Sequence, residues 1–203
     1  MRRMLSEIRI AGYGGQGVIL AASVIGKAVA IFEGGYGTMT QAFGPEARGG
    51  SSSAQVILSS DPILYPYVTR PDILVVMSQE AYTRFTPQLK PGGVLITENE
   101  LVTIGGIHTP DNIRMFGVPA TRLAEELGRK VVLNIVMVGF FGAVTNLLDP
   151  EALRKAAEDS VPPALRKLNL AAFDKGFAYG ADLVHQMTNG VAEVVPALEG
   201  DDV

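Results

Sequence analysis

The stretch that decides the fold is residues 8–32, which read IRIAGYGGQGVILAASVIGKAVAIF. A short apolar run of β type leads into a glycine-rich turn at residues 12–17, and a proline-free segment rich in Ala, Val and Ile follows with the length of a helix. The turn fits the spacing G-x-G-x-x-G in the strand–turn–helix context that this motif requires. The sequence therefore predicts the opening unit of an α/β fold.

Gly12, Gly14 and Gly17 supply the spacing of this motif. Such glycines permit positive φ and close approach, while the free N–H groups at the start of a helix attract an anion. A dinucleotide site also has an acidic residue about 20 positions further on, at the end of the second strand. The acid at that distance is Glu33, which follows the helix directly with no strand between. This departure argues against conventional NAD binding, and a tight turn without a ligand stays an equal alternative.

The remainder of the chain predicts a single Rossmann-like three-layer α/β domain, with a mostly parallel sheet and a helical C-terminal region. The unbroken apolar run at residues 72–78 is typical of a strand buried on both faces, so helices are expected on both sides of the sheet. Residues 34–50 hold six glycines and one proline, and we expect an irregular excursion there in place of a regular element. The domain is expected to span residues 1–190, with a flexible acidic tail at residues 191–203. Further strands are expected at residues 54–58, 94–97 and 113–118, and helices at residues 79–85, 119–127, 133–147, 150–158 and 163–187.

Composition excludes several classes of function. The chain has 203 residues and no Cys, so it cannot hold an iron–sulfur cluster, a thiolate zinc site, a disulfide or a cysteine nucleophile. A formal net charge of -4 argues against a nucleic-acid partner. The longest apolar stretch, residues 131–144, is shorter than the roughly 20 residues of a membrane span, and no signal peptide is evident. We therefore expect a cytoplasmic protein with no membrane partner.

No side chain stands out as a catalytic acid, base or nucleophile. The two histidines, His108 and His185, lie far apart in sequence, and no G-x-S-x-G elbow accompanies them. The acidic residues Glu98 and Glu100 are expected on a solvated turn, and no acidic cluster has the spacing of a metal site. The residues alone thus assign no catalytic group and no metal ligand.

The most unusual local sequence is FGPEARGGSSS at residues 43–53. Arg48 lies there among glycines and hydroxyls, where a guanidinium could bind a carboxylate or a phosphate through two hydrogen bonds. A surface pair between Glu46 and Arg48 in a mobile loop explains the same residues. Because many glycines raise the entropy cost of ordering the loop, their density indicates that the backbone shape matters, either for a ligand or for a partner subunit.

Taken together, these motifs resemble the gamma subunit of 2-oxoacid:ferredoxin (acceptor) oxidoreductases. The likeness covers about the first 145 residues in order. The sequences of the motifs are most similar to the 2-oxoglutarate type of this family. Relatives that act on pyruvate, branched-chain 2-oxoacids and indolepyruvate share enough of the pattern that the identity of the substrate stays open. The stretches that carry the resemblance are IAGYGGQG at residues 10–17, GPEARGGS at residues 44–51, PDILVVMSQEA at residues 71–81, and Asn134 with Gly139 in an apolar segment.

The resemblance implies a multi-subunit enzyme that decarboxylates a 2-oxoacid on thiamine diphosphate, passes electrons through iron–sulfur clusters to ferredoxin, and releases an acyl-CoA. This chain has neither a Gly-Asp-Gly thiamine diphosphate signature followed by Asn nor any Cys. Thiamine diphosphate, magnesium (Mg) and the clusters are therefore expected on partner chains, which the resemblance gives as alpha, beta and ferredoxin-like delta subunits. The isolated chain is expected to be inactive, and ferredoxin is the electron acceptor of the whole complex.

The family motifs carry over to this sequence as binding or interface positions, with no role in the chemistry. A shared site for coenzyme A at the glycine turn is the resulting hypothesis. Two alternatives remain at this point: a stand-alone Rossmann-type nucleotide-binding protein, and a non-catalytic scaffold module. The positions concerned are Gly12, Gly14, Gly15, Gln16, Gly17, Glu46, Arg48, Gly49 and Gly50.

Overall fold

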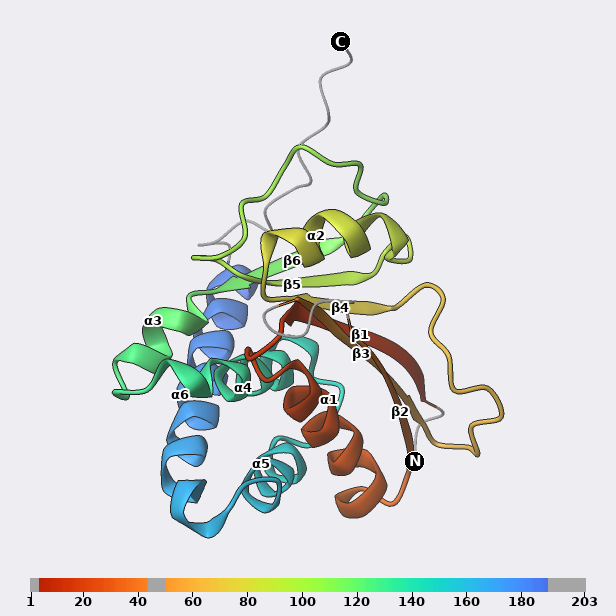
Figure 1. The fold of residues 1–203 in the computed structure, drawn as a ribbon. Coiled ribbons are helices and arrows are strands. Elements are labelled where there is room, and N and C mark those ends of the chain that lie inside the picture. The colour runs from red at the N-terminus through yellow and green to blue at the C-terminus, as the bar shows by residue number, and fades with distance from the viewer. Residues whose placement is uncertain (1–3, 44–49, 190–203) are drawn as a thin grey trace.

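A computed structural model describes residues 4–43 and 50–189 as one α/β unit (Figure 1). The strands are β1 (Leu5–Tyr13), β2 (Tyr36–Phe43), β3 (Ser51–Ser59), β4 (Ile73–Val76), β5 (Val94–Glu98) and β6 (Arg114–Val118). The helices are α1 (Val18–Lys27), α2 (Gln79–Phe85), α3 (Ala120–Glu125), α4 (Leu133–Thr145), α5 (Pro150–Asp159) and α6 (Arg166–Thr188). These bounds confirm the predicted elements to within a few residues, with one exception described below.

The six strands form one sheet in the order β2-β3-β1-β4-β5-β6. β1, β4, β5 and β6 pair in parallel, whereas β3 is antiparallel to both of its neighbours, β1 and β2. Only β3 therefore runs against the others, which confirms the prediction of a mostly parallel sheet. β4 and β5 are connected through α2, whereas residues 99–113 connect β5 to β6 without a helix.

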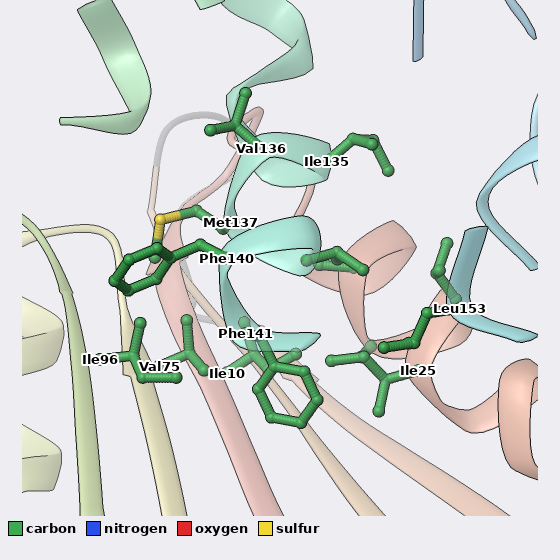
Figure 2. Packing of buried hydrophobic residues seen from close by; sticks show 14 of the residues in the cluster. Ile10, Ile25, Val75, Ile96, Ile135, Val136, Met137, Phe140, Phe141 and Leu153 are labelled. Atoms are coloured by element: carbon green, nitrogen blue, oxygen red, sulfur yellow. The ribbon is translucent and has the colours of Figure 1, made fainter. Parts of the chain in front are cut away.

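Helices cover both faces of the sheet, as the apolar strand at residues 72–78 predicted. α1, α3, α4, α5 and α6 lie on one face, and α2 lies on the other (Figure 1). Successive residues of a strand point to opposite faces, so Val75 of β4 joins the cluster under α4, while Leu74 and Val76 join the cluster under α2. Figure 2 shows the first cluster, in which Phe140 and Phe141 of α4 pack over the sheet.

α4 and α6 pack so closely that glycine is required on both. A β-carbon at Gly139 would collide with the carbonyl oxygen of Phe173, and one at Gly176 would collide with the carbonyl oxygen of Val136. The apolar α4 is thereby buried between the sheet and α6, as a core helix. Across residues 4–43 and 50–189, no helix combines the length and hydropathy needed to cross a membrane.

The prediction of an irregular excursion at residues 34–50 is wrong for its first half, because β2 occupies Tyr36–Phe43; residues 44–49 lie outside the described residues. Close packing against α1 requires glycine at position 37 of β2, because a β-carbon there would come 2.8 Å from the carbonyl oxygen of Gly26. The strand can thus lie close against the helix. A π-helical segment at Ala28–Phe32 continues α1, and Gly34 follows it with a φ of +69°, a left-handed conformation that glycine adopts without strain.

Candidate functional site

The glycine turn lies at the carboxyl edge of the parallel strands, next to the end of β4. The chain leaves β1 toward α1 on one face of the sheet and leaves β4 toward α2 on the other face. In open α/β sheets, ligands bind in the crevice where neighbouring strands send their helices to opposite faces. The predicted strand–turn–helix motif is therefore placed where such folds carry their sites.

Two glycines of the turn have backbone conformations that other residues resist. Gly15 has a φ of +97° and Gly17 a φ of +73°. Among the described residues, none comes within 4 Å of a β-carbon at Gly15, whereas a β-carbon at Gly17 would collide with the side chain of Asn134. The Asn134 amide, at the start of α4, donates a hydrogen bond to the carbonyl oxygen of Gly17 at 3.2 Å. Gly15 is thus the open part of the turn, and Gly17 is fixed by the protein itself.

Gln16 uses its side chain inside the turn. Its Oε1 accepts a hydrogen bond from the Tyr13 backbone N–H at 2.6 Å, and its Nε2 donates to the Met77 carbonyl oxygen at 2.7 Å. A β-carbon at Gly12 would collide with the same Oε1. The side chain therefore links the end of β1 to the end of β4 and fills the space that Gly12 leaves open.

The structure brings the two glycine motifs of the sequence together. The Gly14 backbone N–H donates to the carbonyl oxygen of Gly50 at 2.8 Å, and Gly12 lies opposite Ser52 in the antiparallel pairing of β1 with β3. The glycine turn and the end of the second motif thus form one edge. Glu46, Arg48 and Gly49, the other candidate residues of that motif, lie outside the described residues.

Glu33, the acidic residue at the spacing of a dinucleotide site, lies away from this turn. Glu33 lies beyond the opposite end of α1, where its carboxylate accepts a hydrogen bond from the Asp149 backbone N–H at 2.6 Å. In addition, the antiparallel β3 separates β2 from β1, so the second strand does not adjoin the first. The geometry of Glu33 agrees with the argument against conventional NAD binding.

The expectation of a solvated turn is wrong for Glu98. This residue ends β5 at the carboxyl edge and is fully buried. Its carboxylate accepts hydrogen bonds from the backbone N–H groups of Glu100 at 2.8 Å, Leu101 at 2.7 Å and Thr121 at 2.9 Å. It therefore holds the turn after β5 against the start of α3. The signal in the sequence was an acid placed directly after an apolar strand.

Another charged group lies at the amino edge of the sheet, away from the glycine turn. The Lys90 ammonium contacts the carboxylates of Glu7 at 2.6 Å and Asp72 at 2.8 Å. Burial alone would lower the pKa of Lys90, but the hydrogen bonds to Asp72 and Glu7 outweigh it and raise that pKa. A pocket of about 280 Å³ opens beside this group, and its lining includes Arg114. Within the described ranges, no three His, Cys, Asp or Glu side chains gather as a metal site would need.

Comparison with known proteins identifies the family. The family of pyruvate ferredoxin/flavodoxin oxidoreductases matches residues 7–179. The chain is 42% identical to 2-oxoglutarate synthase subunit KorC of Methanocaldococcus jannaschii, over 89% of this chain and 97% of that subunit. It is 34% identical to ketoisovalerate oxidoreductase subunit VorA of Methanothermobacter thermautotrophicus, over 74% of this chain and 31% of VorA. The keto/oxoacid ferredoxin oxidoreductase gamma subunit from Geobacter sulfurreducens PCA superposes with a TM-score of 0.78 at 36% identity, covering 88% of this chain and 98% of that one.

Fold, motifs and matches together define a subunit of an oxidoreductase. The chain belongs to the pyruvate ferredoxin/flavodoxin oxidoreductase family, as a gamma subunit. The resemblance found in the sequence motifs is thereby confirmed. Its consequence, that the chain is part of a 2-oxoacid:ferredoxin oxidoreductase, is confirmed with it.

Proposed function

We propose that this gamma subunit serves a 2-oxoglutarate:ferredoxin oxidoreductase, in which it contributes to the coenzyme A site and to assembly. The choice of 2-oxoglutarate is supported by the higher identity to the KorC subunit, 42%, than to the VorA subunit, 34%. The amino-acid sequences of the motifs at residues 44–51 and 71–81, which are most similar to the 2-oxoglutarate type, support the same substrate. We assign the clusters to the companion chains because this chain has no Cys, and thiamine diphosphate with magnesium because it has no Gly-Asp-Gly signature followed by Asn.

One observation carries the coenzyme A part of the proposal: the hydrogen bond between Gly14 and Gly50, which joins the two glycine motifs at the carboxyl edge. The start of α1 presents backbone N–H groups at this edge, and a helix N-terminus favours phosphate. Arg48, the cationic residue of the second motif, precedes Gly50 by two residues in the sequence. Coenzyme A carries a diphosphate and a further phosphate, the groups that such donors bind best.

Steady-state kinetics of the assembled enzyme test this assignment. We expect Arg48→Ala to raise the KM for coenzyme A about tenfold or more, because a charged hydrogen-bonding partner is removed. The KM for 2-oxoglutarate should not change. Arg129→Ala, which removes an exposed arginine at another position, is the matched control. An unchanged KM for coenzyme A in the Arg48 variant would overturn the assignment.

A second pair of variants isolates the charge at the turn. Asn tolerates the left-handed conformation of Gly15 better than most residues, and Asp has nearly the same shape. We therefore expect Gly15→Asp to weaken coenzyme A binding much more than Gly15→Asn, since only Asp adds a negative charge facing the phosphates. Equal effects of the two variants would show that no anion binds at the turn.

The assembly part of the proposal rests on apolar side chains exposed in the connection between β3 and β4. Leu64 is 95% exposed, Tyr65 65% and Tyr67 57%. The rings of Tyr65 and Tyr67 pack edge to face with their centroids 5.4 Å apart, so this connection presents an ordered apolar surface. Clustered exposed apolar groups, aromatic ones above all, mark protein interfaces. The partner we propose is a larger subunit of the same enzyme, called here the companion subunit. In VorA the region that matches this chain makes up only 31% of the protein, so there it is joined covalently to a longer remainder.

Co-purification tests this interface. A chain with Leu64→Ser and Tyr65→Ser should lose most of the companion subunit when all subunits are expressed together and isolated through this chain. Leu165→Ser, an exposed apolar residue at the start of α6, is the control and should retain the companion subunit. Full recovery of the companion subunit with the double variant would exclude this surface.

A further inference from the structure

We infer that Gln16 is a positioning residue, which locks the glycine turn in the shape that holds Gly14 against Gly50. This inference rests on the proposed coenzyme A site, and it assigns Gln16 a different part from a ligand contact. Both polar ends of its side chain are already bound, by the Tyr13 N–H and by the Met77 carbonyl. The residue acts on the site through the backbone that it holds.

The chemistry of the two bonds explains why the side chain is an amide. One end must accept from an N–H and the other must donate to a carbonyl, and the two partners lie on different strands, β1 and just beyond β4. Gln supplies both functions. Glu could accept but would set a carboxylate against the Met77 carbonyl, and Met could do neither. The bridge therefore fixes the turn relative to the neighbouring strand.

Gly12 gives the second, independent observation. In dinucleotide-binding folds, glycines of this motif let the backbone approach a pyrophosphate. Here a β-carbon at Gly12 would collide with Oε1 of Gln16, while its next neighbours, Cβ of Met77 at 3.2 Å and Cγ2 of Val18 at 3.4 Å, are only tight. Gly12 is thus required by the side chain of Gln16.

The consequence for the site follows along the turn. Tyr13 is held by Gln16 twice, since its N–H donates to the side chain and its carbonyl accepts from the Gln16 backbone N–H at 3.1 Å. The next residue, Gly14, makes the bond to Gly50. Removal of the Gln16 side chain leaves Tyr13 only its backbone contacts, so the edge that joins the two motifs is held less rigidly.

A double-mutant cycle on the full chain tests the lock. We expect Gln16→Ala to lower the melting temperature by about 4–8 °C, for two lost hydrogen bonds in a chain of this size. Gly12→Ala should lower it at least as much, because the new methyl group expels the Gln16 side chain. In the Gln16→Ala background, however, Gly12→Ala should cost only about 1–3 °C more, since the main obstacle is gone. Additive losses would overturn the inference.

The kinetic readout separates positioning from folding. In the assembled enzyme, Gln16→Ala and Gln16→Met should raise the KM for coenzyme A about tenfold and leave the KM for 2-oxoglutarate unchanged. Gln16→Glu, which keeps one acceptor, should be intermediate, and the exposed Gln186→Ala should match the wild type. A raised KM with Arg48→Ala but a normal one with Gln16→Ala overturns this inference and leaves the proposed function standing. A normal KM with both variants overturns the proposed coenzyme A site itself.

Discussion

Two glycine-to-alanine substitutions should change stability in opposite directions. Alanine in place of a helical glycine stabilises a helix by about 1 kcal/mol. At Gly26 in α1 no collision offsets this stabilisation, since the new β-carbon would meet Cγ1 of Val56 at 3.7 Å, an ordinary van der Waals contact. At Gly176 in α6 the β-carbon would collide with the backbone carbonyl of Val136, which no rotamer change can relieve.

The magnitudes follow from this difference. Gly26→Ala should raise the free energy of unfolding by about 0.5–1 kcal/mol. Gly176→Ala must push α6 away from α4, and overpacking of this kind costs about 1–3 kcal/mol or more. Since a backbone carbonyl cannot move aside, we take the upper end of this range; with the helical gain of about 1 kcal/mol subtracted, the net loss is about 2 kcal/mol, or a melting temperature lower by about 4–8 °C. Chemical denaturation of the full chain measures both values. Stabilisation by Gly176→Ala would refute the close packing of these helices.

Two further predictions concern the charged groups of the sheet edges. Glu98→Gln should lower the free energy of unfolding by about 2–4 kcal/mol, because an amide cannot accept from all of the N–H groups that the buried carboxylate binds. The control is Glu100→Gln, which removes an exposed ion pair and should cost less than about 1 kcal/mol. Similar losses in the two variants would contradict the role of Glu98. Because the folded-state pKa of Lys90 is raised above 10.5, its pairing with Glu7 and Asp72 stabilises the fold fully below that pH and is lost as the pH rises further. Urea denaturation between pH 9 and 12 should therefore show a smaller loss of stability in Lys90→Met than in the wild type, and identical pH profiles would contradict it.

The local sequence pattern was enough to predict those elements whose contacts are close in sequence. The strand, turn and helix of residues 8–32 were predictable, because glycine spacing and an uninterrupted apolar helix specify them locally. β2 was missed, since the glycines in and around it suggested a loop and its strand partner, β3, pairs with it through residues up to 23 positions away, as Tyr36 does with Ser59. The reason for Gly37 lies in α1, which no local pattern could show.

The candidate site followed the same division. Sequence motifs selected the turn and the Arg48 segment separately, but their meeting depends on the antiparallel register that sets Gly12 opposite Ser52. The roles of Gln16 and Glu98 depend on where a side chain points after folding, toward Met77 in one case and toward Thr121 in the other. Such long-range contacts are fixed by the tertiary structure.

The central claim is that this gamma subunit contributes to coenzyme A binding where the two glycine motifs meet. The most direct measurement is calorimetric titration of coenzyme A into the assembled enzyme, with wild-type chain and with Arg48→Ala. The account predicts a Kd weaker by about tenfold to a hundredfold in the variant, as the loss of a charged hydrogen bond implies. Equal Kd values in fully assembled complexes would contradict it.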